Sequence, residues 1–145
     1  MGSLLGLAFM RAGTAFQGAT QLSAADVARL LAVLTQAVSE RGGAVAGQRT
    51  VVDALDGAAA GAAAAAAAGL AAADVLARAA KAAADAADST ADMKPVFGRA
   101  AWLADRARGK RDAGAVAWAT YIAALSAAVT AGSPQPTLGQ NPGLG

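Results

Sequence analysis

The stretch SAADVARLLAVLTQAVSERGG, residues 23–43, decides the fold class of this chain. Ser23 is a favoured N-cap residue, and Asp26, three positions later, gives a start like a capping box with Asp in place of Glu. Apolar residues then recur at helical spacing up to Arg41, and a basic residue followed by two glycines is typical of a helix C-terminus. The stretch therefore predicts a single helix that ends at residues 41–43.

The remaining sequence also has the period of helices and lacks the alternation of apolar and polar residues that indicates strands. Further helices are expected over residues 3–16, 51–67, 71–88 and 113–131, with an irregular segment over 89–112. Thr50 or a neighbour is expected to begin the helix at 51. The fold class is expected to be all-α, an antiparallel bundle or barrel of amphipathic helices. Residues 132–145, rich in Gly and Pro, are expected to form a disordered tail.

Alanine supplies much of the apolar fraction of 56%, and an alanine side chain buries little area. Helices that approach closely through small residues compensate for the small area that each alanine buries. Gly57, Gly61 and Gly69 interrupt the alanine-rich segment, and each would cost about 1 kcal/mol relative to alanine in an exposed helix. Close helix packing is therefore the expected reason for all three.

The amino-acid composition limits the kinds of catalytic and metal-binding sites that the chain can form. The chain has no Cys and no His, which excludes disulfides, thiolate metal sites and the most common general base. A net charge of +2 gives little support to nucleic-acid binding. Arg11 follows the N-terminal apolar run instead of preceding it, the reverse of a signal peptide, and acidic residues flank the alanine run at 58–73. A cytoplasmic protein with no membrane segment is therefore expected.

Three loops combine glycines with polar or basic residues next to an expected helix start: 42–50, 89–99 and 109–115. Six of the twelve Lys and Arg residues lie between Lys94 and Arg111. Loops separated by an even number of helices emerge at the same end of an up-and-down bundle, so the first two loops are expected to meet. Backbone amides, a helix N-terminus and an Arg side chain suit a phosphate or nucleotide. For each loop alone, helix caps and solvated charges remain the alternative.

Taken together in this order, five short motifs resemble the nucleotide-binding subunit, or C-terminal domain, of dihydroxyacetone kinase. The motifs are GSLLG (2–6), ERG (40–42), GQRTVVD (47–53), GRAAWLADR (98–106) and DAGA (112–115). The resemblance extends from residue 2 to about residue 130, so residues 1–131 are identified as a partial nucleotide-binding domain of that family. It implies a barrel of antiparallel amphipathic helices with ADP or ATP bound at one end.

The resemblance also implies which residues border the nucleotide. These are Gly42, Thr50, Val51, Arg99, Asp112, Ala113 and Gly114. The alternative for Arg99 is a helix cap, and the alternative for Asp112 is the N-cap of the last helix. For Asp112 the two roles are compatible.

The chain departs from the family pattern in ways that bear on activity. The family's Gly-Asp-x-Asp motif, whose aspartates hold two Mg²⁺ ions, is not found in this sequence, and the first helices of the domain are expected to be missing. Gln48 replaces the motif Asp, Val51 the Met, Lys110 a His and Ala113 the Pro. No catalytic residue and no metal ligand is therefore assigned, and the chain alone is expected to be inactive.

One pair of carboxylates leaves an alternative open. Asp53 and Asp56 lie three positions apart on one expected helix face, which could hold Mg²⁺ or could place acidic charge near a helix N-terminus. Missing helices would also expose an apolar seam. The expected partners are a dihydroxyacetone-binding kinase subunit or domain, a phosphocarrier protein, or a second copy of the chain.

Two functions follow. One is the ADP- or ATP-binding part of a kinase that phosphorylates dihydroxyacetone or a related short ketose. The other is a non-catalytic helical interaction module derived from the same family. Binding of nucleic acid by the basic loop is a weaker alternative, because no matching motif accompanies the charges.

Overall fold

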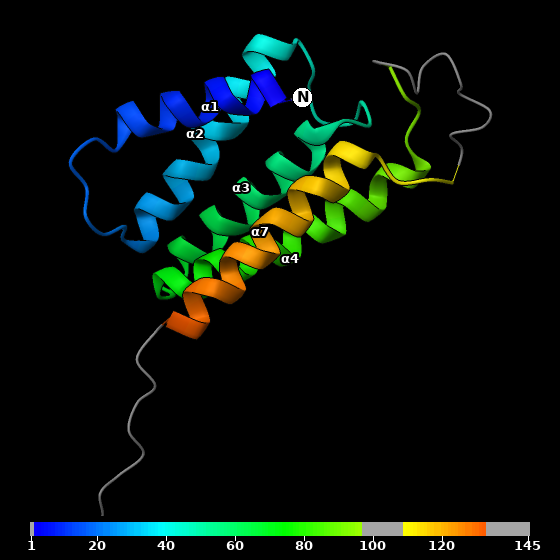
Figure 1. Cartoon of the computed structure of the whole chain (residues 1–145). Coiled ribbons are helices and arrows are strands. Elements are labelled where there is room, and N and C mark those ends of the chain that lie inside the picture. Colours follow the sequence, from blue (N-terminus) through cyan, green and yellow to red (C-terminus); the bar gives the residue numbers. More distant parts are fainter. Residues whose placement is uncertain (1, 97–108, 133–145) are drawn as a thin grey trace, which may run out of the picture.

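The computed structural model describes residues 2–96 and 109–132, and over these residues helices joined by loops are the regular secondary structure (Figure 1). The helices are α1 (Gly2–Ala15), α2 (Ala24–Gly42), α3 (Val51–Ala67), α4 (Ala72–Ser89), the short 3₁₀ helix η1 (Thr90–Asp92) and α7 (Ala113–Gly132). Each expected helix is confirmed to within one residue at either end, and so is the all-α class. The expected tail lies outside the described residues, apart from Gly132, which ends α7.

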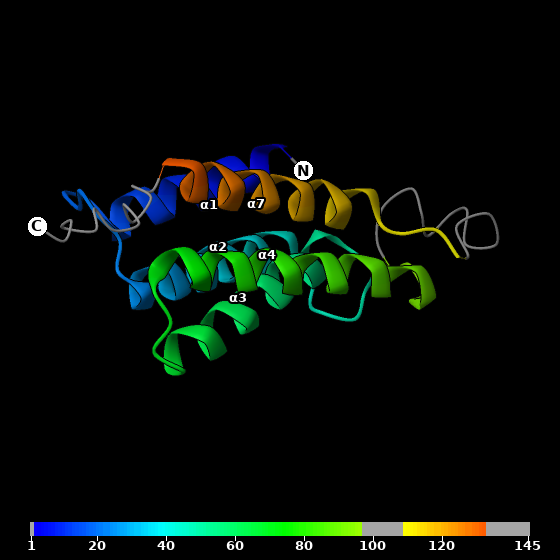
Figure 2. The same ribbon diagram turned by 90° about the horizontal axis from the view of Figure 1, so that it is seen from below.

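The helices pack in layers. α1 and α7 lie on one side of the molecule, with α2 and α4 beneath them and α3 on the far side (Figure 2). The closest packing is between α3 and α4, followed by α4 against α7, α2 against α3, and α1 against α2. The largest fully buried apolar side chains come from α2, α3, α4 and α7: Leu34, Val38, Leu55, Val75 and Ile122.

The caps of α2 are those that its sequence predicts. The Asp26 amide donates to Ser23 Oγ at 3.2 Å, and the Ser23 amide donates to the Asp26 carboxylate at 3.0 Å. Hydrogen bonds from the Ser23 hydroxyl and amide lower the pKa of Asp26 below its ordinary value. At the other end, Gly43 has a left-handed φ of 68° and its amide donates to the Ser39 carbonyl at 2.8 Å.

Glycines allow the close approach of α3 and α4. A Cβ added at Gly57 would lie 2.7 Å from Ala86 Cβ and 2.9 Å from the Ala82 carbonyl oxygen. One added at Gly61 would lie 2.7 Å from Ala82 Cβ. Close packing is thus confirmed for these two positions. It is wrong for Gly69, which has open space around it and a φ of +77° in the turn between the helices, a conformation that favours glycine.

Helix α7 is the one described helix that is long and apolar enough to cross a membrane, judged by length and composition. Its inner side, which includes Ala115, Trp118 and Ile122, is buried in the core. Its outer side carries Tyr121 and Leu125, which are exposed. Packing therefore explains the apolar residues of the inner side alone.

Candidate functional site

Three loops meet at the end of the molecule where α3 and α7 begin (Figure 1). The Arg49 guanidinium donates a hydrogen bond to the Lys110 carbonyl, which joins the first loop to the third. The Val96 amide lies 3.5 Å from the Gln48 carbonyl, which it contacts across the first and second loops. The expected meeting of the first two loops is confirmed for their described parts, and the third loop joins them through Arg49.

The N-terminus of α3 is closed by its own side chains. Thr50 Oγ1 accepts from the Val52 amide at 3.1 Å, which confirms Thr50 as the N-cap. The carboxylate of Asp53, which is 5% exposed, accepts from the Thr50 amide at 2.7 Å and the Gly47 amide at 2.5 Å. Asp53 therefore completes a capping box and also anchors the preceding loop.

This arrangement favours the capping interpretation of Asp53 over a metal ligand. Its two oxygens already accept from backbone amides, while Asp56 is exposed one turn further along α3. Within residues 2–96 and 109–132, no group of three or more His, Cys, Asp or Glu is placed to hold a metal ion. The described residues therefore do not fit a Mg²⁺ site.

The loop before α3 has a defined shape. The Gln48 side chain accepts from the Val45 amide at 2.9 Å, so the residue that replaces the family's Asp closes a local turn. Arg49 adopts a left-handed φ of 59° and is 4% exposed. A left-handed, buried arginine is uncommon, and here its side chain reaches the loop that precedes α7. This role of Arg49 could not be inferred from the sequence.

The N-terminus of α7 carries the strongest candidate for phosphate binding. Asp112 accepts from the Ala115 amide at 2.8 Å, which confirms its alternative role as the N-cap. First-turn amides have no acceptor within a helix, so the amides of Ala113 and Gly114 remain free of intrahelical bonds. Ala113 is exposed and Gly114 is half-buried. Both amides therefore suit an anion at the positive end of the helix dipole.

A buried hydroxyl holds this helix start in place. Thr90 is fully buried, donates to the Ala87 carbonyl at 2.6 Å and accepts from the Asp112 amide at 2.8 Å. It thereby ties the end of α4 to the start of α7. Thr90 had no expected role, and its place as a hydroxyl residue just after a helix is the one feature of the sequence that points to this role.

Cationic side chains surround the same end of the molecule. Lys94, Lys110 and Arg111 are exposed, and Arg111 forms an ion pair with Asp88 at 2.7 Å. Because both partners of this pair are more than half exposed, the pair contributes little to stability. Lys94 and Lys110 are exposed there and would be available to an anionic ligand.

Gly42 is not joined to these contacts. Gly42 is exposed at the end of α2, where an added Cβ would lie 3.5 Å from Leu4 Cδ1 of α1. Its nearest neighbour is thus α1, not the start of α3 or α7. Arg99 lies outside the described residues, and its role remains a prediction.

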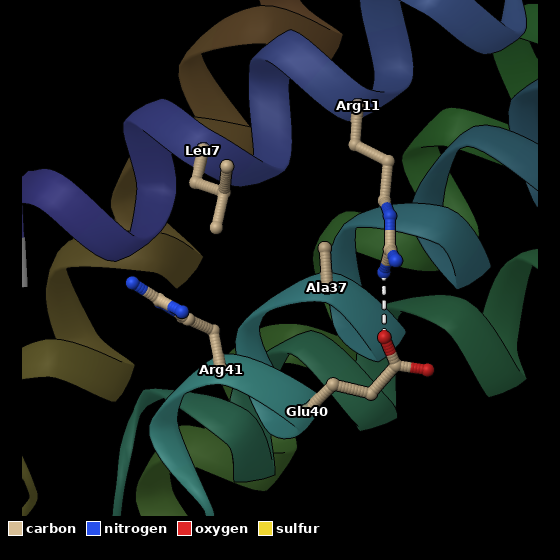
Figure 3. A pocket seen from close by; sticks show the side chains of 5 residues that line it. All are labelled: Leu7, Arg11, Ala37, Glu40 and Arg41. Atoms are coloured by element: carbon tan, nitrogen blue, oxygen red, sulfur yellow. Dashed lines mark hydrogen bonds and ion pairs between the residues drawn. The ribbon is translucent and has the colours of Figure 1, made fainter.

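A separate cavity of about 250 Å³ lies between α1 and α2 (Figure 3). Arg11 reaches down from α1 to Glu40 on α2, with 2.6 Å between Nη1 and Oε2. The side chain of Arg41, which also lines the cavity, points away from this pair (Figure 3). The Arg11 guanidinium and the Gln36 amide both donate to Glu40, and they lower the pKa of that carboxyl below its ordinary 4.5. This half-exposed pair links α1 to α2 and contributes little to stability.

Replacing Glu40 by Gln is expected to lower the melting temperature slightly at neutral pH. Because the pKa of Glu40 is depressed in the folded state, its stabilisation is present above pH 4.5 and is lost as the pH falls through the folded pKa. The difference in melting temperature between wild type and Glu40→Gln should therefore close on acidification. Asp85→Asn, which removes the i,i+4 pair with Lys81 inside α4, is the control. A difference that persists unchanged at pH 2.5 would contradict this role.

The geometry defines a class of protein: an all-helical domain whose loops and the N-termini of two helices converge at one end. The family model of the DAK2 domain matches residues 1–127. The chain therefore belongs to the DAK2-domain family, the dihydroxyacetone kinase family, and the resemblance read from its motifs is confirmed at that level. A search among curated proteins found no match to this chain.

Proposed function

We propose that this chain binds ADP or ATP by its phosphates at the start of α7, as the nucleotide-binding part of a dihydroxyacetone kinase. One observation carries the proposal. The amides of Ala113 and Gly114 lack an intrahelical acceptor, and the turn before them is held by Asp112 and Thr90. Fixed amides at a helix N-terminus, with cationic side chains nearby, fit a phosphate group. Membership of the DAK2-domain family adds support.

In this proposal the chain provides the phosphate-binding part of the kinase site. In the family, Mg²⁺ bridges the phosphates and neutralises charge in the transfer step. The described carboxylates do not fit that ion, because Asp53 is held by two amides. We therefore propose that the chain supplies amides and cationic charge, and that it is inactive alone. A dihydroxyacetone-binding subunit or domain, in the cytoplasm, would supply the substrate site.

The function is tested by calorimetric titration of the chain with ADP, with and without Mg²⁺. In Ala113→Asp the new carboxylate would repel phosphate, although an acidic residue in the first turn favours the helix dipole. ADP affinity should fall at least about tenfold, which corresponds to roughly 1.4 kcal/mol, while the circular dichroism spectrum is retained. Arg99→Ala is likewise expected to weaken binding and to leave helicity intact.

The matched control is Ala117→Asp, which places the same charge at an exposed position further along α7. It should bind ADP as the wild type does. No binding by folded wild-type protein, or equal affinities of wild type and Ala113→Asp, would contradict the proposal. Loss of helicity in Arg99→Ala would make Arg99 a structural residue.

A second candidate function, the non-catalytic interaction module, is favoured by a different observation. An apolar cavity of about 410 Å³ opens between α1, α2 and α7. If the folded chain fails to bind ADP, the interaction module becomes the favoured function, with this cavity as its binding surface.

A further inference from the structure

The backbone of Arg49 adopts a conformation that favours glycine. Its φ is 59°, in the left-handed region that is uncommon for residues with a side chain. The amides of Gly47 and Thr50 both donate to the Asp53 carboxylate, so the chain on either side of Arg49 is fixed. Unfavourable conformations of this kind persist where the surrounding structure imposes them, and they are enriched at binding sites. Because glycine would fit this backbone better, the arginine points to a role of its side chain.

The side chain of Arg49 is buried and carries a permanent positive charge. The residue is 4% exposed, and its guanidinium donates a hydrogen bond to the Lys110 carbonyl. A hydrogen bond from a charged donor is stronger than one between neutral groups, and it is stronger again away from water. The two residues are 61 positions apart, so this bond joins the loop before α3 to the segment before α7.

The segment that leads into α7 is held from two sides. On one side, Thr90, directly after α4, accepts from the Asp112 amide at 2.8 Å. On the other side, Arg49 holds the Lys110 carbonyl, two residues before Asp112. The amide of Ala113, which follows directly, is the first of the two amides proposed to bind phosphate. A displacement of Lys110 would therefore displace the phosphate-binding amides as well.

We propose that Arg49 is a positioning residue for the phosphate site at the start of α7. Its hydrogen bond to the Lys110 carbonyl keeps the amides of Ala113 and Gly114 where they can receive a phosphate. This role of Arg49 rests on the proposed function, in which ADP or ATP binds there by its phosphates. Arg49 itself does not touch the ligand, because its side chain is buried and donates to a backbone carbonyl.

The same bond couples the phosphate site to the loop before α3. Coupling between two sites is reciprocal, so a contact that strengthens ADP binding is itself strengthened by the same factor when ADP binds. ADP at the start of α7 should therefore hold the loop 45–50 more firmly. The Gly47 amide, which donates to Asp53 within this region, reports on that change.

Calorimetric titration with ADP tests the positioning role in Arg49→Gln. The ADP affinity should fall about tenfold, within the usual range for coupled sites, while circular dichroism shows that the variant is folded at the titration temperature. A residue that contributed to stability alone would leave the ADP affinity of the folded protein unchanged. Arg49→Lys, which keeps the positive charge and a donor, should recover part of the affinity.

The matched control is Arg78→Gln. It removes the same charge from an exposed position in the first half of α4, away from Thr90. This variant should bind ADP as the wild type does, so a loss seen in Arg49→Gln alone is not a general effect of charge.

Amide exchange in the wild type tests the coupling without any substitution. Saturating ADP should slow exchange of the Gly47 amide about tenfold, to match the loss of affinity in Arg49→Gln. In that variant the slowing at Gly47 should be absent. The Gly69 amide, which donates to the Ala66 carbonyl in the turn between α3 and α4, is the control and should exchange at the same rate with and without ADP.

Two results would overturn the positioning role and leave the phosphate site in place. One is a folded Arg49→Gln with the ADP affinity of wild type. The other is a wild type that binds ADP without any change of exchange at Gly47, and this result decides even if Arg49→Gln does not fold. Absence of ADP binding by folded wild type would instead overturn the proposed function, and the role of Arg49 with it.

Discussion

Gly57→Ala is expected to destabilise the protein by about 2–3 kcal/mol, near the upper part of the usual range for an over-packed core. The added Cβ would meet Ala86 Cβ at 2.7 Å and the Ala82 carbonyl oxygen at 2.9 Å, which are both closer than real contacts. Alanine is favoured over glycine in a helix by about 1 kcal/mol, so propensity alone predicts the opposite sign. Urea unfolding followed by circular dichroism measures the difference.

Gly61→Ala gives a matched comparison at the same helix contact. Its Cβ would meet Ala82 Cβ at 2.7 Å, and the next neighbour is the Arg78 carbonyl oxygen at 3.1 Å. Ala82→Gly removes the first contact, so the pair Gly61→Ala and Ala82→Gly should show a favourable coupling energy in a double-mutant cycle. Ala86→Gly should rescue Gly57→Ala less well, because a backbone carbonyl remains in the way.

A glycine without neighbours provides the control. Gly6 in α1 has nothing within 4 Å of an added Cβ, so Gly6→Ala should stabilise the protein by about 0.4–1 kcal/mol. Stabilisation by Gly57→Ala of the same size would mean that α3 and α4 are not in close contact at that point.

Asp53→Ala carries the second large effect, an expected loss of about 2–3 kcal/mol in the free energy of unfolding. The substitution leaves the Gly47 and Thr50 amides without the carboxylate that accepts from both. It also removes the capping box that begins α3. Chemical denaturation monitors the loss, and amide exchange in residues 45–50 should rise with it.

Asp56→Ala serves as the control, because Asp56 is an exposed carboxylate on the same helix. Its effect should stay within about 0.5 kcal/mol, as is usual for surface substitutions. If both variants behaved alike, Asp53 would not be the anchor of the loop. A Mg²⁺-dependent rise in the stability of wild type that Asp53→Ala abolishes would restore the metal-ligand interpretation.

The helix boundaries could be predicted because their signals are local. Ser23, Asp26 and Gly43 each act through backbone groups within a few residues, and the structure places them in those roles. Thr50 and Asp112 are likewise caps that a short stretch of sequence defines. Local hydrogen bonds of this kind depend little on the rest of the fold.

The contacts between loops could not be predicted in the same way. Arg49 reaches Lys110, and Thr90 reaches Asp112, across sequence separations of 61 and 22 residues. Each partner lies on a different loop, so the pairing depends on how the helices pack. The sequence predicts close packing at Gly57 correctly. It predicts the same role for Gly69, which instead lies in a turn.

The apolar face of α7 was also only partly foreseeable. The sequence predicts an exposed seam, but the three large exposed residues of α7, Tyr121, Leu125 and Val129, are identified only once Trp118 and Ile122 are seen to face the core. In a helix without charges, the apolar pattern alone does not mark which side is buried.

The most direct test of the nucleotide-binding claim is a ¹H–¹⁵N correlation spectrum of the labelled chain during titration with ADP. We expect saturable shifts of the Ala113 and Gly114 amides, with smaller changes at Thr50 and Val51. Amides in the C-terminal half of α7, around Leu125, should stay in place. Shifts confined to another region, or no shifts with folded protein at millimolar ADP, would contradict a phosphate site at the start of α7.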